Sequence, residues 1–238
     1  MSRLNKPIAV FRHSPLEGPG YFATFLDRHS IPWELIRIDE GAAVPNSVAG
    51  FAGLCFMGGP MSVNDELPWI RQVLELIRTA AARDVPVIGH CLGGQLISKA
   101  LGGRVTRNPT KEIGWGAVTP VRDTPVAAEW LGDIDVFEAF HWHGETFSIP
   151  HGATRILASA HCANQAYALG PHLGMQCHVE MTEDMIRQWS RQWADEYAAP
   201  GPAVQTPEQM MEHAAARIAA MRVVADHLYA HWIGGLKH

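Results

Sequence analysis

The sequence lacks any long apolar run. Its longest apolar region, residues 51–63, is interrupted by Gly-Gly-Pro, whereas a helix that spans a membrane needs about 20 consecutive apolar residues. The first residues lead directly into the strand-like segment Ile8–Phe11, without the apolar stretch and small-residue cleavage site of a secretory signal. We therefore expect a soluble, cytoplasmic protein with no membrane partner.

An excess of basic charge is also absent, and cysteine is scarce. The 238 residues contain 19 Lys+Arg and 24 Asp+Glu, a formal net charge of −5, without a basic block. This balance argues against nucleic-acid binding through phosphate neutralisation. The cysteines are too few and too dispersed for a disulfide scaffold, so we expect four reduced thiols: Cys55, Cys91, Cys162 and Cys177.

Motifs for metals and nucleotides are missing as well. Three His/Cys pairs, at residues 90–91, 161–162 and 177–178, could suggest zinc. Neighbouring residues on a strand point to opposite faces, however, and neither C-x-x-C nor H-E-x-x-H occurs. No P-loop is present, and no G-x-G-x-x-G follows the first strand. The sequence therefore predicts neither a metal site nor a cofactor.

The first hundred residues alternate short apolar runs with helical patterns, which is typical of an α/β fold with a parallel sheet. In residues 67–83 apolar side chains recur every three or four positions. The continuously apolar Val85–Gly89 suits a strand buried on both faces. We expect strands at residues 8–11, 33–38, 51–57 and 85–89, and helices at residues 20–29, 67–83 and 92–101.

The remaining residues divide into two parts. Residues 104–178 contain shorter apolar segments separated by Gly, Pro and Asn. We interpret them as the rest of the sheet with an inserted β-ribbon, with strands at residues 116–121, 136–141, 156–160 and 165–169. From residue 182 onward the pattern is helical. We predict that residues 1–238 form a single domain, with residues 182–238 as a helical C-terminal extension packed on it.

A helix start is recognisable within this extension. Thr206 has the character of an N-cap, Pro207 occupies the first helical position, and Gln209 is placed for a capping box, which predicts the start of a long helix. Apolar residues recur at spacings of three and four over residues 211–232. This stripe packs on its own domain or, as a minority alternative, forms a homodimer contact.

The segment Gly89–Gln95 reads Gly-His-Cys-Leu-Gly-Gly-Gln between a predicted strand and a predicted helix. A nucleophile on a sharp strand-to-helix turn needs small neighbours, because its backbone is strained and the substrate must approach closely. The helix N-terminus favours the thiolate of Cys91 and leaves the Leu92 N–H free for an oxyanion. An ordinary buried thiol is the alternative, but glycines on both sides favour a nucleophile.

A thiol nucleophile needs a base, and the base needs a group that orients it. If Gly174–His178 forms a strand, His178 and Glu180 project to the same side, so that the carboxylate reaches one imidazole nitrogen while the other faces Cys91. We predict that Cys91, His178 and Glu180 are catalytic.

A second glycine-rich element, Gly58-Gly59-Pro60, directly follows the third predicted strand. It is either a tight turn or the source of a second oxyanion donor, the N–H of Gly59.

These segments together with Gln176–Glu180 resemble the class I (triad) glutamine amidotransferases, most closely stand-alone proteins similar to the amidotransferase domain of GMP synthase. The resemblance extends over about residues 8–180. It implies a flavodoxin-like fold of three layers, with a mostly parallel open sheet flanked by helices. It also implies that Cys91 attacks the side-chain amide of L-glutamine, that His178 protonates the departing ammonia, and that water then releases glutamate from a thioester.

The same resemblance implies roles for further residues. The oxyanion donors fall on Gly59 and Leu92, and the substrate contacts fall on Gly58, Gln95, His141 and His143. Glu145 stands where the family commonly has Asp, which leaves its role unassigned, and Val179 replaces a usual proline.

Three functions agree with these residues. A glutaminase could pass ammonia to a separate synthetase subunit, because no nucleotide-binding motif is present. A free hydrolase of γ-glutamyl amides or peptides would use the same thiol. A non-catalytic binding or regulatory protein is disfavoured by the intact Cys91, His178 and Glu180.

Overall fold

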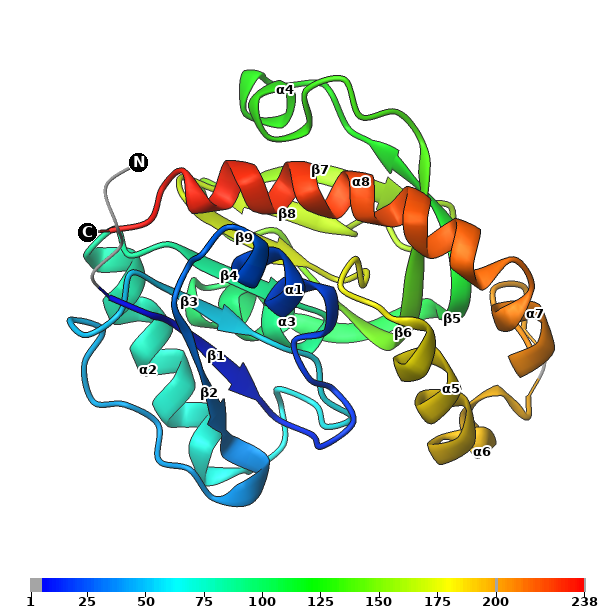
Figure 1. The fold of residues 1–238 in the computed structure, drawn as a ribbon, viewed down its shortest axis with the longest axis horizontal. Coiled ribbons are helices and arrows are strands. Elements are labelled where there is room, and N and C mark those ends of the chain that lie inside the picture. Colours follow the sequence, from blue (N-terminus) through cyan, green and yellow to red (C-terminus); the bar gives the residue numbers. More distant parts are fainter. Residues whose placement is uncertain (1–5, 200, 238) are drawn as a thin grey trace.

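The computed structural model describes residues 6–199 and 201–237, and its centre is a nine-stranded mixed sheet (Figure 1). The strand order is β2-β1-β3-β4-β9-β8-β7-β5-β6. The strands are β1 (Ile8–Arg12), β2 (Trp33–Arg37), β3 (Gly53–Phe56), β4 (Val87–His90), β5 (Val105–Pro120), β6 (Phe137–Phe147), β7 (Thr154–Ser159), β8 (Ala166–Leu169) and β9 (His172–Met175).

The half of the sheet from β2 to β9 is parallel. Every residue of β3 and β4 is buried, which fits apolar runs covered on both faces. In this half the four strands predicted from the first hundred residues are confirmed, with ends that differ by at most two residues. Parallel strands meet with their carboxyl ends at one edge, where α/β proteins place their ligands.

The other half, β8, β7, β5 and β6, is antiparallel. The predicted strands at residues 116–121 and 136–141 are much longer in the structure, where they become β5 and β6 and pair as a long ribbon. The register shifts between Arg107 and Glu112. Asn108 and Pro109 lie in this irregular stretch, and these turn-favouring residues gave the sequence its loop-like appearance.

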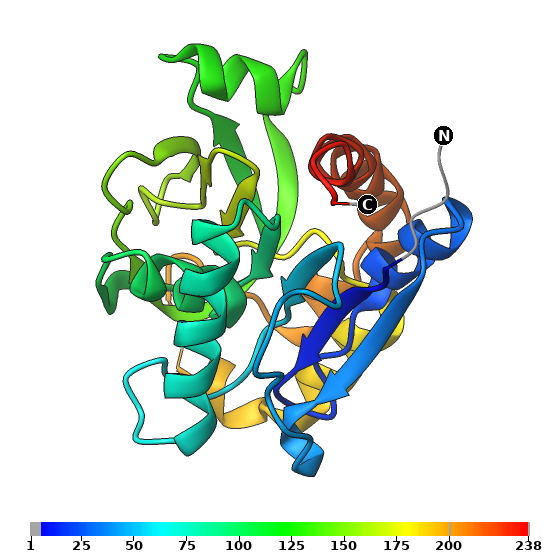
Figure 2. The same cartoon turned by 90° about the vertical axis from the view of Figure 1, so that its left-hand side faces the viewer.

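Helices cover both faces of the sheet and complete the predicted three layers. They are α1 (Gly20–Arg28), α2 (Pro68–Ala82), α3 (Leu92–Ala100), α4 (Pro125–Leu131), α5 (Glu183–Gln192), α6 (Ala194–Tyr197), α7 (Pro207–Met211) and α8 (Ala214–Ile233), with a short 3-10 helix at Ile38–Glu40. Alternate residues of β1 face different layers: Ile8 and Val10 join a cluster with α1 and α8, whereas Ala9 and Phe11 join α2 and α3. Figure 2 shows α8 end-on beside the sheet.

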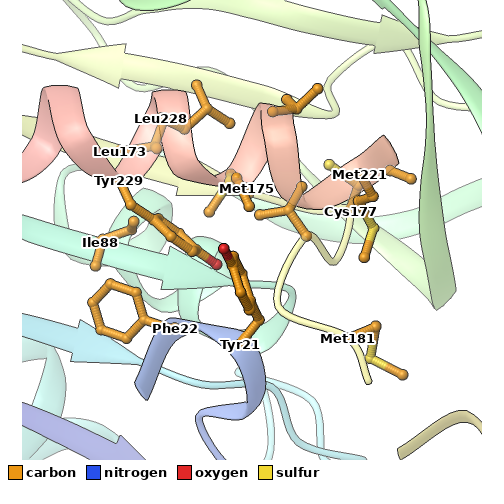
Figure 3. Close-up of a cluster of buried hydrophobic side chains, with 14 of the residues drawn as sticks. Tyr21, Phe22, Ile88, Leu173, Met175, Cys177, Met181, Met221, Leu228 and Tyr229 are labelled. Atoms are coloured by element: carbon orange, nitrogen blue, oxygen red, sulfur yellow. The ribbon is translucent and has the colours of Figure 1, made fainter. Parts of the chain in front are cut away.

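An apolar cluster lies between the sheet and the helices α1 and α8. Figure 3 shows Phe22 of α1, Ile88 of β4, Leu173 of β9 and Tyr229 of α8 in this cluster. The Tyr229 hydroxyl lies 2.9 Å from His90 Nε2. The C-terminal helix is therefore hydrogen-bonded to the residue that precedes Cys91.

The helical extension differs from its prediction at one point. Thr206 does form a capping box with Gln209, but the helix that it starts is only α7. His213 adopts a left-handed backbone with φ of 55°, which separates α7 from α8. The predicted long helix is thus two helices, and the apolar stripe of α8 is buried against its own chain. Among the described residues, no helix combines the length and apolar character needed to cross a membrane.

The turn from β4 into α3 depends on close backbone packing at Gly93. A Cβ at this position would overlap the carbonyl oxygen of Phe56 in the neighbouring strand. We predict that Gly93→Ala lowers the free energy of unfolding by about 3 kcal/mol, and Tm by roughly 10 °C, because backbone atoms must move apart. Gly50→Ala is the matched control for thermal unfolding, since a Cβ at Gly50 meets nothing within 4 Å. Equal Tm values for the two variants would contradict the prediction.

Candidate active site

Cys91 occupies a sharp turn between β4 and α3. Its φ of 50° and ψ of −106° are unusual for a non-glycine residue. Gly89 and Gly94 make this turn feasible, because a Cβ at Gly89 would overlap Gly93, and one at Gly94 would overlap the Met175 carbonyl oxygen. The strained turn that the glycines predicted is therefore present, with Cys91 7% exposed at the start of α3.

His178 and Glu180 lie just beyond the end of β9. The expected strand Gly174–His178 is wrong in this respect, because β9 ends at Met175. His178 is held instead by two backbone hydrogen bonds with Phe140 of β6: its N–H donates at 2.8 Å, and its carbonyl accepts at 3.2 Å. The predicted contact still forms, since His178 Nδ1 lies 2.6 Å from Glu180 Oε1, and both side chains are 1% exposed.

Each partner in this buried pair stabilises the charge of the other. Burial alone would lower the pKa of His178, but the charges of Glu180 and Cys91 and the hydrogen bond to Glu180 raise it well above its ordinary value. Burial alone would raise the pKa of Glu180, but the charges of His178 and His90, with the hydrogen bond to His178, lower it to about 2. Both shifts favour the charged forms, an imidazolium beside a carboxylate, and an imidazolium carries a proton that it can give away.

Gln176 is a contact of Cys91 that the sequence reasoning missed. Its Nε2 lies 3.4 Å from Cys91 Sγ, and its Oε1 accepts a hydrogen bond of 3.1 Å from Gln95 Nε2. Gln95 also approaches the carbonyl oxygen of Glu145, at 3.5 Å. The structure thus places Gln95 beside the thiol, connected to it through Gln176.

A cavity of about 240 Å³ opens above Cys91. It is somewhat smaller than the roughly 300–1,000 Å³ typical of ligand sites. The loop after β3, the start of α3 and the end of β6 provide most of its wall. The remaining residues come from outside the motifs of the sequence analysis: Glu17, Trp189, Trp193 and Glu196. The Trp189 ring stands edge-on to His178 at 5.0 Å, so the helical extension forms part of the site.

Of the two glycines after β3, only Gly59 lies in the wall of this cavity. Gly59 lines it, and a Cβ there would overlap Leu92, so the two proposed oxyanion residues are neighbours. Gly58 faces Glu17 and the imidazole of His178 instead. A side chain at Gly58 would displace the Glu17 carboxyl.

His141 and His143 are placed differently from their predicted substrate contacts. His141 is absent from the cavity wall and borders a separate recess beside Glu112. Burial lowers its pKa to about 4. His143 does line the Cys91 cavity, but its Nδ1 contacts the Glu145 carbonyl at 2.9 Å, and its Nε2 faces Glu112 at 2.9 Å. Because side chains at i and i+2 of a strand share a face, both rings turn toward Glu112.

A strained thiol turn, a buried imidazole and a carboxylate that orients it define a cysteine-dependent hydrolase or transferase by their arrangement. The class-I glutamine amidotransferase family model matches residues 26–187. The chain belongs to this family.

Individual relatives agree with this assignment. The glutamine amidotransferase-like protein YfeJ of Salmonella typhimurium is 32% identical over 185 residues, which cover 73% of this chain and 75% of YfeJ. The crystal structure of a glutamine amido transferase from Methylobacillus flagellatus superposes with a TM-score of 0.94 at 47% identity, covering 98% of this chain and 96% of that one.

More distant relatives carry two different names. Gamma-glutamyl peptidase 3 of Arabidopsis thaliana is 24% identical over 177 residues, which cover 70% of this chain and 71% of the peptidase. A GMP synthase (glutamine-hydrolyzing) of Wolbachia pipientis is 29% identical over 125 residues, covering 52% of this chain and 24% of the synthase. The expected resemblance to a part of GMP synthase is confirmed.

Glu17 makes the stability of the site depend on pH. Its carboxyl is buried, which raises its pKa from 4.5 to about 8 although His178 opposes the shift. Between these values the folded chain keeps a proton that the unfolded chain has lost, so stability falls as pH rises through this window. We predict that Glu17→Gln, which cannot ionise, exceeds the wild type in Tm by several degrees at pH 8 and by much less at pH 5.

Thermal unfolding of both proteins across this pH range tests the prediction. Glu34→Gln, at an exposed position, is the control and should show no pH-dependent gap. A gap for Glu17→Gln that stays constant from pH 5 to pH 8 would disprove the assignment of a buried neutral carboxyl.

Proposed function

We propose that the protein hydrolyses the side-chain amide of L-glutamine through Cys91, His178 and Glu180. The observation that carries the proposal is the buried pair at 2.6 Å between His178 and Glu180, next to a thiol on a strained turn at the base of a small cavity. A thiol, an oriented imidazole and a carboxylate in this order suit acyl transfer.

The reaction proceeds in two halves. Cys91 Sγ attacks the amide carbon, and the proton on His178 passes to the nitrogen, so that the C–N bond breaks and ammonia leaves a glutamyl thioester. A water molecule then attacks the thioester carbon and gives its proton to His178. The C–S bond breaks, glutamate leaves, and the thiolate and imidazolium are restored. Glu180 orients the imidazole and stabilises its charge throughout.

The oxyanion that forms in each half needs two N–H donors. Leu92 is the first residue of α3, and the first amides of a helix have no intrahelical acceptor. Gly59 is in van der Waals reach of Leu92 and lines the same cavity. We assign the oxyanion hole to these two N–H groups. They would stabilise the negative charge that develops on the substrate's carbonyl oxygen in the transition state.

The charge of the cavity wall favours an ammonium group on the substrate. Glu145 and Glu196 contribute two carboxylates, whereas the buried carboxyl of Glu17 stays neutral below its pKa of about 8. Among the described lining residues there is no lysine or arginine. Ser62 Oγ donates to Glu145 at 2.8 Å and fixes one of these carboxylates. An α-amino group of glutamine would be attracted here, which gives Glu145 the role that the sequence left unassigned. Gln95 forms part of this wall, and Gly58 leaves room behind it for the Glu17 carboxyl.

A γ-glutamyl peptide is the second candidate substrate, because a further recess adjoins the cavity. The two share Gly144, Glu145 and Glu196, and the recess also contains Arg107 and Lys111. Lys111 pairs with Glu196 at 2.6 Å, which leaves Arg107 as the cation available to a carboxylate on a larger leaving amine. Gamma-glutamyl peptidase 3 is similar to 70% of this chain.

Three expectations from the sequence stay predictions: a separate synthetase that receives ammonia, a cytoplasmic location and a homodimer.

Substitutions in the proposed triad should affect hydrolysis unequally. We predict that Cys91→Ser and His178→Ala lower kcat at least roughly 10⁴-fold, whereas Glu180→Ala lowers it less, because the base remains when its orientation is lost. Mass spectrometry after acid quenching should find a glutamyl adduct on Cys91 of the wild type. Cys162→Ser should keep the adduct, since Cys162 does not line the cavity. An adduct that persists in Cys91→Ser would exclude Cys91 as the nucleophile.

The choice of substrate can be tested at Arg107. If the leaving amine binds in the adjoining recess, Arg107→Ala should raise KM for a γ-glutamyl dipeptide about tenfold, because one charged contact is lost. KM for glutamine should stay unchanged. Arg104→Ala, outside the recess, is the control. Hydrolysis of glutamine alone, with no turnover of the dipeptide, would exclude the peptidase alternative.

A further inference from the structure

A second polar cluster lies on the β5–β6 ribbon. Glu112 of β5 and His141 and His143 of β6 bring one ligand atom each within 4.8 Å of one another. All three are buried, with exposures of 3%, 1% and 5%. Glu112 and His143 are paired across the ribbon, and His141 follows on the same face. Two imidazoles and one carboxylate in such a group are a ligand set for a transition metal.

The carbonyl contacts of the two rings use one nitrogen of each ring and leave the other nitrogen directed into the cluster. His143 Nδ1 lies 2.9 Å from the Glu145 carbonyl, which can only accept, so Nδ1 carries the proton. His143 Nε2 then has a lone pair, and it has no hydrogen-bond partner among the described residues although Glu112 Oε2 is 2.9 Å away. His141 Nε2 faces the Gly116 carbonyl at 3.4 Å in the same way, which leaves the lone pair of its Nδ1. This lone pair is in contact with Gln165 Nε2 at 3.4 Å, a long hydrogen bond that a metal ion would replace.

The carboxylate is supported in the way that metal ligands are. Ser159 Oγ donates to Glu112 Oε1 and Gln165 Nε2 donates to Glu112 Oε2, each at 2.8 Å. Gln165 Oε1 is buried and without a hydrogen-bond partner among the described residues. Histidines that donate one N–H to a carbonyl, together with a hydrogen-bonded carboxylate, form the outer support that metal sites use to fix ligand orientation.

We propose that Glu112, His141 and His143 bind one divalent transition-metal ion of the zinc type. Three protein ligands leave a fourth position, and the recess of about 340 Å³ lined by Glu112, His141 and Ser159 gives access to it. The expectation of no metal, which rested on short motifs in the sequence, is thereby revised. The ligands come from two strands and are 29 and 31 positions apart along the chain.

The ion would stabilise the wall of the Cys91 cavity without taking part in hydrolysis. His143 contacts the Glu145 carbonyl, which Gln95 Nε2 also approaches at 3.5 Å. Holding the imidazole of His143 therefore holds this part of the wall. Metal binding does not depend on the proposed glutaminase reaction, and a binding measurement can test it separately.

Titration of the metal-free full chain with Co²⁺ tests the proposal by absorption spectroscopy. We expect one equivalent to give d–d bands without a sulfur-to-cobalt charge-transfer band, and an unchanged spectrum in Cys91→Ala. In Glu112→Gln and in His141→Asn the affinity should fall at least about 100-fold, because a direct ligand is lost. His151→Asn, at an exposed position, should bind as the wild type does.

Three results would overturn the proposal: no stoichiometric binding to the wild type, binding that is unchanged in both cluster variants, or a charge-transfer band that disappears in Cys91→Ala. The second would leave the cluster as a hydrogen-bonded network, and the third would assign the ion to the catalytic thiol. X-ray absorption of the zinc-loaded wild type requires no variant. Two imidazole ligands and no sulfur are expected, whereas sulfur ligation would contradict the proposal.

Discussion

The strained backbone of Cys91 is the constraint on which the site depends. A residue at φ of 50° and ψ of −106° costs of the order of 1–3 kcal/mol, and it persists only when its surroundings allow no alternative. Here the surroundings are two backbone contacts without side chains between them, at Gly93 against Phe56 and at Gly94 against Met175. The close packing against β3 and β9, the strands on either side of β4, therefore holds the turn in this conformation, with Cys91 in the wall of the cavity.

The site must also accommodate buried charged groups. His178 and Glu180 are each 1% exposed, and charges at such depth are tolerated when they are paired and hydrogen-bonded. His90 is equally buried, and burial lowers its pKa and so favours the neutral ring. Glu180 stabilises His178 at 2.6 Å, and Tyr229 contacts His90 at 2.9 Å. Among the described residues, His178 Nε2 is a buried nitrogen without a hydrogen-bond partner. Within the same described part of the chain, Glu180 Oε2 is likewise without a hydrogen-bond partner, so the pair satisfies each of its two side chains at one polar atom.

The sequence could predict the parts of this site that lie in short segments. Glycines around Cys91 indicated the turn, and the spacing of His178 and Glu180 indicated their contact, although the strand assumed for them ends earlier. It could not predict groups assembled from distant segments. Glu17 and Trp189 reach the cavity only through the packing of the loop after β1 and of α5, and Glu112 meets His143 only through the register of β5 with β6. The helix α4 was missed despite a Thr124 cap and a following proline.

In the proposed function, chemistry and selectivity originate in different parts of the chain. The family match over residues 26–187 contains Cys91, His178 and Glu180, whereas Glu17, Trp189, Trp193 and Glu196 lie outside it and still line the cavity. The sheet determines the thiol, imidazole and carboxylate geometry, because backbone contacts between β3, β4, β6 and β9 position it. Under the proposed function, residues of the first loop and of the helices after β9 would decide which γ-glutamyl compound reaches Cys91. Two names among the relatives, gamma-glutamyl peptidase and GMP synthase, are what such a division would produce.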